Sequence, residues 1–400
     1  MMYNETELYC VPSTLHGKRI SVYQLATWKN GLPFRKIDFS DKGKPIIKIA
    51  ELNGGITAST SYTEHEYSRD VFLTKGDLVF SWSGNPDTSI DVYRYSLPDG
   101  WLNQHIFKVT ANRNFVSADY LYYILKFLKP NFSMIAKNKQ TTGLGHVTIA
   151  DLQRMSVIVP SFECQDKISG ILKAIDDKIE NNNAINHNLQ QQAAAIFAEW
   201  LNTCTDYSTI GDMSHNILDY SPLANEQIRL LNSSDITEGV FPVAPLVPNK
   251  GLKGHFKKRF KFGDILYSEI RPRNHHYGFV LFDASNYIAS TRLMVIRAIE
   301  NKVSPAMLYQ YLLLPEVEAE FTAKTESRSG TFPQGNYADM ASIQVPYSSI
   351  DSQATVSETL SQIRYTIAHN QLESQRLAEV RDALLPKLMS GEIDVSDIQL

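Results

Sequence analysis

The chain repeats itself once, and the period of the repeat is nearly half its length. Residues 75–81 (KGDLVFS) return as residues 262–268 (FGDILYS) at an offset of 187, and residues 157–160 (VIVP) return as residues 343–346 (IQVP) at an offset of 186. A looser echo links residues 52–55 with residues 236–239. Three matches in one order at nearly one offset predict two domains of one plan, because the period is far too long for a solenoid unit. A length of 400 residues also suits two or three domains.

Each half has the same predicted order of elements. Short alternating runs interrupted by Gly, Pro, Asn and Asp predict strands and turns, as in residues 45–49, 78–82 and 105–109. One helix is expected inside each half and a long helix closes each half, over residues 118–128, 305–322, 163–201 and 351–385. Because proline disrupts helices, Pro386 is expected to end the second long helix and to leave Leu388 beyond its last regular turn.

The two closing helices share a hydrophobic repeat of 3.5 residues, which is typical of a coiled-coil seam. The first seam contains Ile168, Leu172, Ile175, Ile179, Asn182, Asn186, Leu189, Ala193, Ile196 and Trp200. The second, 188 residues later, contains Val356, Leu360, Ile363, Ile367, Asn370, Ser374, Leu377, Arg381, Leu384 and Leu388. Both seams turn polar at equivalent places, and buried polar residues fix the register and partner of a coil at some cost in stability. The alternative is two unrelated amphipathic helices, each packed on its own domain.

An antiparallel pairing of these helices would place the two domains at opposite ends of a rod. The paired helices would be roughly 50 Å long, which is about one and a half turns of B-DNA. Such a geometry suits a protein that reads two separated DNA segments.

Charge is divided unevenly along the chain. The net charge of −4 excludes a uniformly basic nucleic-acid coat. Residues 163–201 carry −3 and residues 351–400 carry −4, which leaves +3 on the rest of the chain. The acidic helices are therefore expected to face each other and protein partners, while residues 250–273 concentrate lysine and arginine.

Basic and amide side chains in these domains are candidates for DNA contacts, because Lys and Arg neutralise phosphates and Arg or Gln can read base edges. The candidates are Gln104, His105, Lys137, Lys139 and His146 in the first half, and Lys250, Lys253, Lys257, Lys258, Arg259, Arg271, Arg273, Arg292 and Arg328 in the second. The alternative for each is a solvated charged face.

Motifs for catalysis and metal binding are missing. There is no GxxxxGK[ST] loop, and residues 143–145 are too short for a dinucleotide fingerprint. Residues 85–87 (NPD) are interpreted as a turn, residues 176–178 (DDK) as the outer face of a helix, and His275 with His276 as a polar loop without a third metal ligand. No catalytic residue, metal site or cofactor is assigned to the chain, which favours a binding protein over an enzyme.

Targeting features are equally sparse. Cys10, Cys164 and Cys204 lie far apart and form neither a disulfide framework nor a CxxC site. The first eleven residues do not resemble a signal peptide, and no apolar run approaches a membrane span. We therefore expect a cytoplasmic protein without membrane contact.

At this point the sequence resembles the specificity subunit of type I restriction–modification enzymes, over essentially its whole length. The strongest similarity is residues 381–393 (RDALLPKLMSGEI), which match the closing motif of the family. Residues 176–180 and 195–197 resemble the family's central conserved region, and residues 263–268 with the following Arg271-Pro272 also fit. The first half departs from the pattern at residues 199–202, where the second half has Pro386 and the SGEI segment.

The resemblance implies an α+β fold in which two α/β target-recognition domains with mixed sheets are joined by two long helices pairing as an antiparallel coiled coil, with pseudo-twofold symmetry. The domains are expected at residues 1–162 and 202–350, the central spacer helix at residues 163–201, and the C-terminal spacer helix and tail at residues 351–400. Each domain would read one half of a bipartite, asymmetric site in double-stranded DNA. The helices would dock two modification subunits, which carry S-adenosylmethionine and methylate adenine, and restriction/translocase subunits would add cleavage in phage defence.

Two other functions remain open at this stage. The chain could be a self-sufficient DNA methyltransferase or nuclease with a diverged site, or a non-catalytic scaffold on a coiled coil. Activity of the purified chain alone with S-adenosylmethionine or Mg²⁺ would favour the enzyme. Absence of sequence-specific DNA binding in the assembled complex would favour the scaffold.

Overall fold

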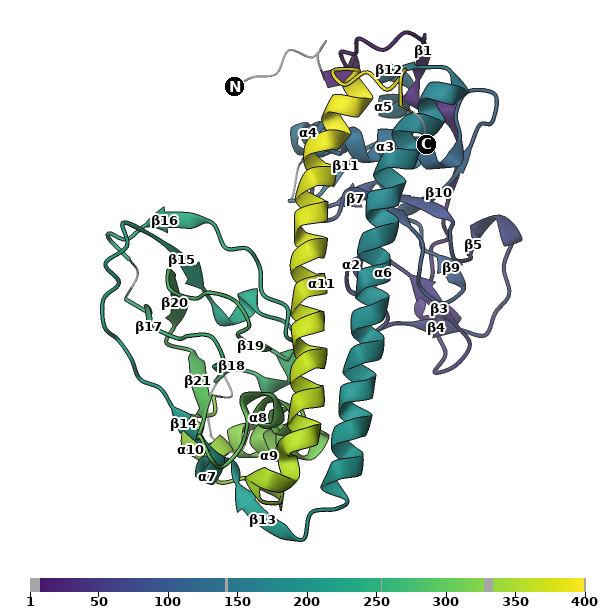
Figure 1. Ribbon diagram of the computed structural model, residues 1–400. Coiled ribbons are helices and arrows are strands. Elements are labelled where there is room, and N and C mark those ends of the chain that lie inside the picture. Colours follow the sequence, from purple (N-terminus) through teal and green to yellow (C-terminus); the bar gives the residue numbers. More distant parts are fainter. Residues whose placement is uncertain (1–7, 141–142, 253, 327–333, 399–400) are drawn as a thin grey trace. The chain divides into compact units, whose positions relative to one another are not determined.

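The computed structural model describes residues 8–140, 143–252, 254–326 and 334–398 (Figure 1). The chain forms two compact units, Met1–Asp177 with Leu377–Leu400 and Lys178–Arg376. Two long helices, α6 (Phe162–Leu201) and α11 (Ile350–Ser390), each contribute one segment to each unit. The units therefore divide within the long helices, whereas the predicted domain boundaries lie at the helix ends.

The first unit is built on an antiparallel sheet with the strand order β2-β10-β6-β8. Its strands are β2 (Ala26–Asn30), β6 (Leu78–Ser81), β8 (Asp91–Arg94) and β10 (Ile106–Ala111). A second sheet has the order β4-β3-β9-β5 and contains β3 (Lys44–Ile47), β4 (Tyr62–Thr63), β5 (Phe72–Leu73) and β9 (Gly100–Leu102). Its β3–β9 pair is parallel, so the sheet is mixed. Smaller pairs join β1 (Lys18–Ser21) to β12 (Ser156–Val159), and β7 (Ser83–Gly84) to β11 (Gly145–His146).

Helices complete the core of the first unit. Ser117 caps α3 (Ala118–Phe127) by accepting from the Tyr120 backbone N–H, and α4 (Lys129–Asn138) follows it. The apolar residues of both helices pack with the strands in one cluster that includes Phe80, Val109 and Phe132. The shorter helices are α2 (Ile49–Gly54) and α5 (Ile149–Arg154).

The second unit repeats this topology. Its antiparallel sheet has the order β14-β21-β18-β19, from β14 (Ser214–Asn216), β18 (Ile265–Ser268), β19 (Tyr277–Phe279) and β21 (Leu293–Ala298). Its mixed sheet has the order β16-β15-β20-β17, from β15 (Gln227–Leu231), β16 (Leu246–Pro248), β17 (Phe256–Lys258) and β20 (Tyr287–Ser290), with β15 and β20 parallel. The pair β13 (Asp206–Thr209) and β22 (Gln344–Tyr347) matches β1 and β12. The predicted repeat of two β-rich units with mixed sheets is confirmed.

The helices inside the units differ from the prediction in two places. The single helix expected at residues 305–322 is wrong, because α8 (Pro305–Leu312) ends before Pro315 and α9 (Pro315–Glu326) begins there. A proline is favourable in the first turn of a helix but not within it, so it starts a new helix. In the first unit, α4 was not predicted. Two short helices, α7 (Ile210–Met213) and α10 (Tyr337–Ala341), complete the second unit.

The predicted end of the second long helix at Pro386 is also wrong. Helix α11 continues through Pro386 to Ser390. A proline inside a helix removes one backbone hydrogen bond and crowds the preceding turn. The turn after it is nevertheless held by packing, because Leu388 and Met389 are buried in the core of the first unit. Tertiary burial therefore outweighs the local cost of the proline.

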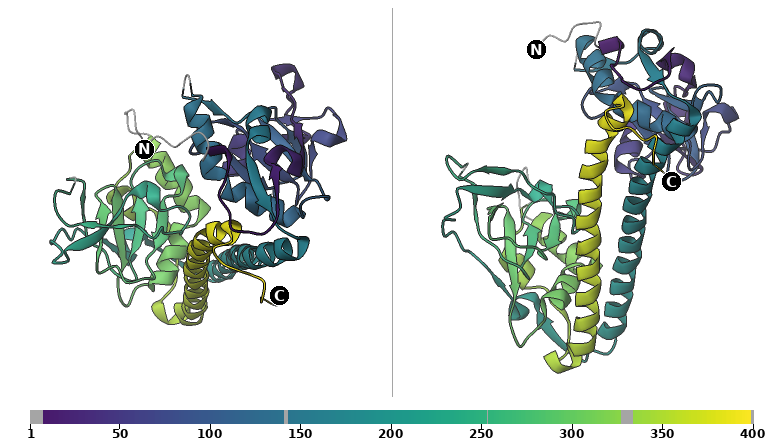
Figure 2. Two further views of the ribbon diagram at one scale, coloured as in Figure 1. Left: turned by 90° about the horizontal axis from the view of Figure 1, so that it is seen from above. Right: turned by 45° about the horizontal axis from the view of Figure 1, so that its top comes forward.

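Within each unit the segments of α6 and α11 run antiparallel (Figure 2). In the first unit, Ile168 and Leu172 share a core with Leu384 and Leu388. In the second unit, the seam residues of the two helices enter one core, namely Leu189, Ala193, Ile196, Val356, Leu360, Ile363 and Ile367. Helix α6 therefore packs in the cores of both units and not on one domain alone.

The polar positions of the two seams meet in the second unit. Asn370 donates from Nδ2 to Asn186 Oδ1 at 2.9 Å, and Asn182 donates to Ser374 Oγ at 3.3 Å. Asn182 and Asn186 are buried. Of the remaining predicted seam residues, Trp200 is buried. Ile175, Ile179, Leu377 and Arg381 are half-buried.

Candidate nucleic-acid interface

Three separate segments of the first unit converge beside the end of β6. Trp82 follows β6, His105 precedes β10, and His146 lies in β11. The backbone joins them, because the Trp82 N–H donates to the His105 carbonyl at 3.3 Å and the Val147 N–H donates to the Trp82 carbonyl at 2.9 Å. The β7–β11 pairing places His146 opposite Ser83. We call Trp82, His105 and His146 the first cluster.

The side chains of the first cluster touch one another and reach solvent. The Trp82 ring lies 5.7 Å from the His105 ring and 5.9 Å from the His146 ring. Ser83 Oγ is 2.9 Å from His146 Nδ1, and Gln104 Nε2 is 3.4 Å from His105 Nε2. Burial and the neighbouring His146 lower the pKa of His105, which favours its neutral form. The cluster is therefore built from aromatic and imidazole rings.

Two other first-half candidates have acidic partners in this unit. Lys137 Nζ is 2.6 Å from Asp87 Oδ1, and Lys139 Nζ is 2.5 Å from Asp151 Oδ1. Asp151 is buried and caps α5 with Thr148. Burial would raise the pKa of Asp151, but hydrogen bonds from Lys139 and Thr148 lower it. The structure therefore gives Lys139 a structural ion pair where the sequence suggested a DNA contact.

The second unit holds an equivalent set of residues. In the strand pairings, Ser81 lies opposite Ile106 and Ser268 lies opposite Leu293, so Trp82 corresponds to Glu269 and His105 to Arg292. Gln334 forms an antiparallel β-bridge with Ile270, and this pairing is equivalent to that of His146 with Ser83, so Gln334 corresponds to His146. The same backbone bonds recur, from the Glu269 N–H to the Arg292 carbonyl and from the Gly335 N–H to the Glu269 carbonyl, both at 2.9 Å. We call Glu269, Arg292 and Gln334 the second cluster.

The chemistry of the second cluster differs from that of the first. Arg292 Nη1 donates to Gln334 Oε1 at 2.7 Å, and Gln334 Nε2 lies 3.4 Å from Glu269 Oε2. Arg292 and Gln334 are exposed. Lys258 Nζ approaches Glu269 Oε1 at 3.5 Å and offsets its charge. The cluster therefore presents the positive charge and the donors of Arg292 beside an oriented amide.

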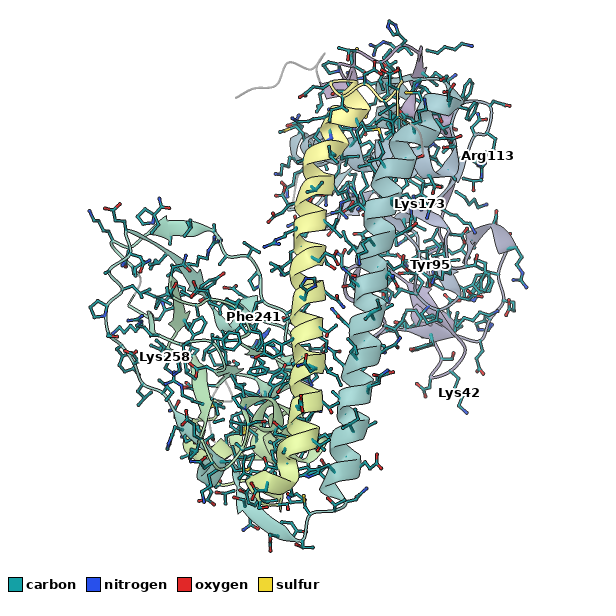
Figure 3. All side chains as sticks on the ribbon, viewed as in Figure 1. Lys42, Tyr95, Arg113, Lys173, Phe241 and Lys258 are labelled. Carbon is teal, nitrogen blue, oxygen red and sulfur yellow. The ribbon has the colours of Figure 1, made fainter. Side chains whose placement is uncertain are left out.

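The basic segment of residues 250–273 is only partly a surface. Lys258 (Figure 3) is 3% exposed and donates to the Leu293 carbonyl at 2.7 Å. Burial lowers the pKa of Lys258 against the opposing effect of Glu269. The prediction that Lys258 contacts phosphate is wrong, because side chains alternate along β17 and only Lys257 points outward.

The other basic candidates of the second half have diverse surroundings. Lys250 and Lys257 are exposed. Arg259 donates to Ser221 Oγ at 3.3 Å, and Arg273 lies 3.1 Å from Glu326. Arg271 is exposed and has a positive φ of 48°. The candidates Lys253 and Arg328 lie outside the described residues.

The motifs interpreted as non-catalytic are placed in loops and helices. Asn85 Oδ1 accepts from the Asp87 N–H at 2.9 Å, which makes the NPD segment a side-chain-supported turn. His275 lies between Glu238 and Glu318, at 2.9 Å from each, and the hydrogen bond with Glu238 raises its pKa. Within the described ranges, no group of three or more His, Cys, Asp or Glu side chains could hold a metal ion.

Trp82, Glu269 and Gln334 were not among the sequence candidates. The repeat could have indicated Trp82 and Glu269, because they lie 187 residues apart, the same offset that relates His105 to Arg292. His105 and Arg292 were both predicted, but their equivalence was not. Gln334 needs an offset of 188 and lies far from any matching segment, so only the strand pairing reveals it.

Comparisons with known proteins agree with this architecture. The sequence matches the family described as type I restriction modification DNA specificity domain, over residues 20–191 and 225–381. The chain belongs to this family. It is the DNA specificity subunit of a type I restriction–modification system, the non-catalytic component, as the resemblance implied.

Individual relatives of the specificity family cover different parts of the chain. The HindI specificity subunit of Haemophilus influenzae is 35% identical over 182 residues, which are 45% of this chain and 39% of that protein. The MjaIX specificity subunit of Methanocaldococcus jannaschii is 22% identical over 89% of this chain and 94% of its own length. The crystal structure of the S subunit from M. genitalium superposes with a TM-score of 0.58 at 16% identity, covering 95% of this chain and 97% of that one, and so shares the fold.

No helix in the part of the chain that the structure describes is long and apolar enough to cross a membrane.

Proposed function

We propose that each unit reads one half of a bipartite, asymmetric sequence in double-stranded DNA. The observation that supports this most is the pair of equivalent clusters. One sheet topology, used twice, brings three segments together at the same place, and different side chains occupy that place in the two units. A fold repeated with different surface chemistry suits two different half-sites in one target.

The long helices supply the second part of this proposal. Helix α6 carries a net charge of −3 and helix α11 a net charge of −1, which disfavours contact with phosphates. We assign them as the spacer between the half-sites and as the docking surface for two modification subunits. Those subunits would bring S-adenosylmethionine and methylate adenine, and restriction/translocase subunits would join the same complex.

The proposal is tested by methylome sequencing of the host with and without this chain. We expect a two-part adenine-methylation motif that disappears when the chain is deleted. A motif that is continuous, or that persists without the chain, would contradict the proposal. The purified chain alone should show neither methylation with S-adenosylmethionine nor cleavage with Mg²⁺, and activity without partners would favour a self-sufficient enzyme.

A further inference from the structure

We infer that the first cluster and the second cluster select bases in the two half-sites, with Arg292 reading a guanine and His146 contributing to readout of the other half. This inference rests on the proposed function and adds the residues that determine specificity. It begins from a contrast inside the chain between positions that the two units share and positions at which they differ.

The framework around the clusters is shared. Asp77 and Asp264 occupy equivalent turns, and Ser81 and Ser268 are both buried at the ends of equivalent strands. The backbone bonds that join the three segments are the same in both units. The two serines are buried, Asp77 pairs with Lys108, and Asp264 pairs with Arg297, so these side chains are used within the fold.

The cluster positions differ completely on that shared framework. The indole and two imidazoles of the first cluster correspond to the carboxylate, guanidinium and amide of the second cluster. The exposed members, His105, His146, Arg292 and Gln334, protrude from turns or from short strand segments. Exposed positions that change chemistry on an unchanged framework are expected where one fold recognises two different sequences.

The second cluster is organised for hydrogen-bond readout. Arginine is the residue that most often donates two hydrogen bonds to guanine O6 and N7. Gln334 accepts from Nη1 of Arg292 at 2.7 Å, which holds the guanidinium in one orientation and leaves its other donors for a base. Holding a planar donor group in place before binding lowers the entropic cost of recognition.

The adjacent loop shows the backbone strain that often accompanies binding sites. Ile270 bridges to Gln334, and the next residue, Arg271, has a φ of 48°; His275 at the far end of this loop has a φ of 53°. These are left-handed conformations that non-glycine residues seldom adopt. They are maintained by tertiary contacts such as those of His275 with Glu238 and Glu318.

The first cluster offers a different mode of recognition. Its aromatic faces and imidazole rings favour apolar contact and single hydrogen bonds over the bidentate pairing available to a guanidinium. Trp82 packs against Phe107 with ring centroids 5.7 Å apart and donates from Nε1 to Asn30 at 3.0 Å, so it supports the cluster. His146 is exposed and is the better probe of base contact.

The test uses the complex of the full chain with its modification subunits and a duplex library randomised within the half-sites. Base preference at each position is measured for wild type, Arg292→Ala, Arg292→Lys, Gln334→Ala and His146→Ala. Lys302→Ala is the matched control, because it removes one positive charge from an exposed residue of the same unit that is not a DNA-contact candidate.

We expect Arg292→Ala to reduce guanine preference at one position of one half-site by about 10- to 100-fold, and Arg292→Lys to reduce it less. His146→Ala should alter the other half-site only, and Lys302→Ala should leave every preference unchanged. Unchanged base preferences in the cluster variants, or uniformly weaker binding with unchanged preferences, would overturn the inference. A wild-type complex that selects no bipartite sequence would instead overturn the proposed function.

Discussion

The polar layer between α6 and α11 leads to a prediction in which two similar substitutions have opposite effects. Asn182 is 1% exposed, and its Nδ2 donates to Glu373 Oε2 at 2.8 Å and to Ser374 Oγ at 3.3 Å. Its Oδ1 is buried and has no hydrogen-bond partner among the described residues. Asn370 differs, because it supplies the donor to Oδ1 of the buried Asn186.

Asn182→Leu should stabilise the second unit. It removes an unpaired buried carbonyl, which costs about 1 to 3 kcal/mol, and buries an apolar side chain in its place. Glu373 keeps its ion pair with Lys178 at 3.1 Å after the change. The lost hydrogen bonds reduce the gain, so we expect about 1 to 2 kcal/mol, or a rise in Tm of about 3 to 6 °C. Asn370→Leu leaves Asn186 Oδ1 without its donor and should lower Tm by about 2 to 4 °C.

Thermal unfolding of the full chain, followed by circular dichroism, measures both effects. Asn183→Leu is the matched control, because Asn183 is exposed one residue along the same helix and should change the stability by no more than about 0.5 kcal/mol. A lower Tm for Asn182→Leu, or equal shifts for both variants, would refute the reasoning. The double variant should pair in more than one register, which cysteine cross-linking across the seam would detect.

Three further predictions concern charge. Lys257→Ala should reduce the slope of log affinity against log salt by about one, whereas Lys258→Ala should destabilise the fold without changing that slope. Equal slopes for both variants in a salt titration of DNA binding would contradict the assignment of Lys257 as a phosphate contact and of Lys258 as a buried structural residue. Arg381→Ala should destabilise the first unit by about 1 to 3 kcal/mol in urea unfolding. Arg381 Nη1 lies 2.8 Å from Asp176 Oδ1, and the Tyr123 hydroxyl donates to the other oxygen of the same carboxylate, so the change leaves this carboxylate without its cation. Arg376→Ala, at an exposed position of the same helix, is the control. The pKa of His275 is raised in the folded state, so the stabilisation by its charged form is present at low pH and is lost as pH rises through the folded pKa. His275→Asn should therefore cost more stability near pH 5.5 than near pH 9. An equal cost at both pH values would contradict the pairing of charged His275 with Glu238 and Glu318.

Much of the architecture was predictable because it depends on periodic patterns. The 3.5-residue seam located both long helices, and the two Gly-Asp turns located equivalent strands 187 residues apart. Pro386 misled the prediction because a local rule was applied where burial of Leu388 and Met389 decides the outcome. Pro315 was the opposite case, in which the local rule was overlooked.

The candidate interface was predictable only in part. A count of basic residues cannot tell Lys257 from Lys258, because their exposure depends on which face of β17 meets the core. It also selects Lys139, whose charge is used within the fold by Asp151. The clusters were missed as groups because each combines three segments distant in sequence, and the strand pairing that joins them has no local signature.

The measurement that tests the central claim most directly is a single-base-pair scan of the DNA target with the assembled complex. Two separate blocks of sensitive positions should appear, each mismatch costing about 1 to 3 kcal/mol, with an insensitive gap between them. Changing the sequence of the gap should have little effect, and changing its length by one base pair should greatly weaken binding. One continuous block of sensitive positions, or tolerance to a changed gap length, would contradict the account that two units of this chain read two half-sites.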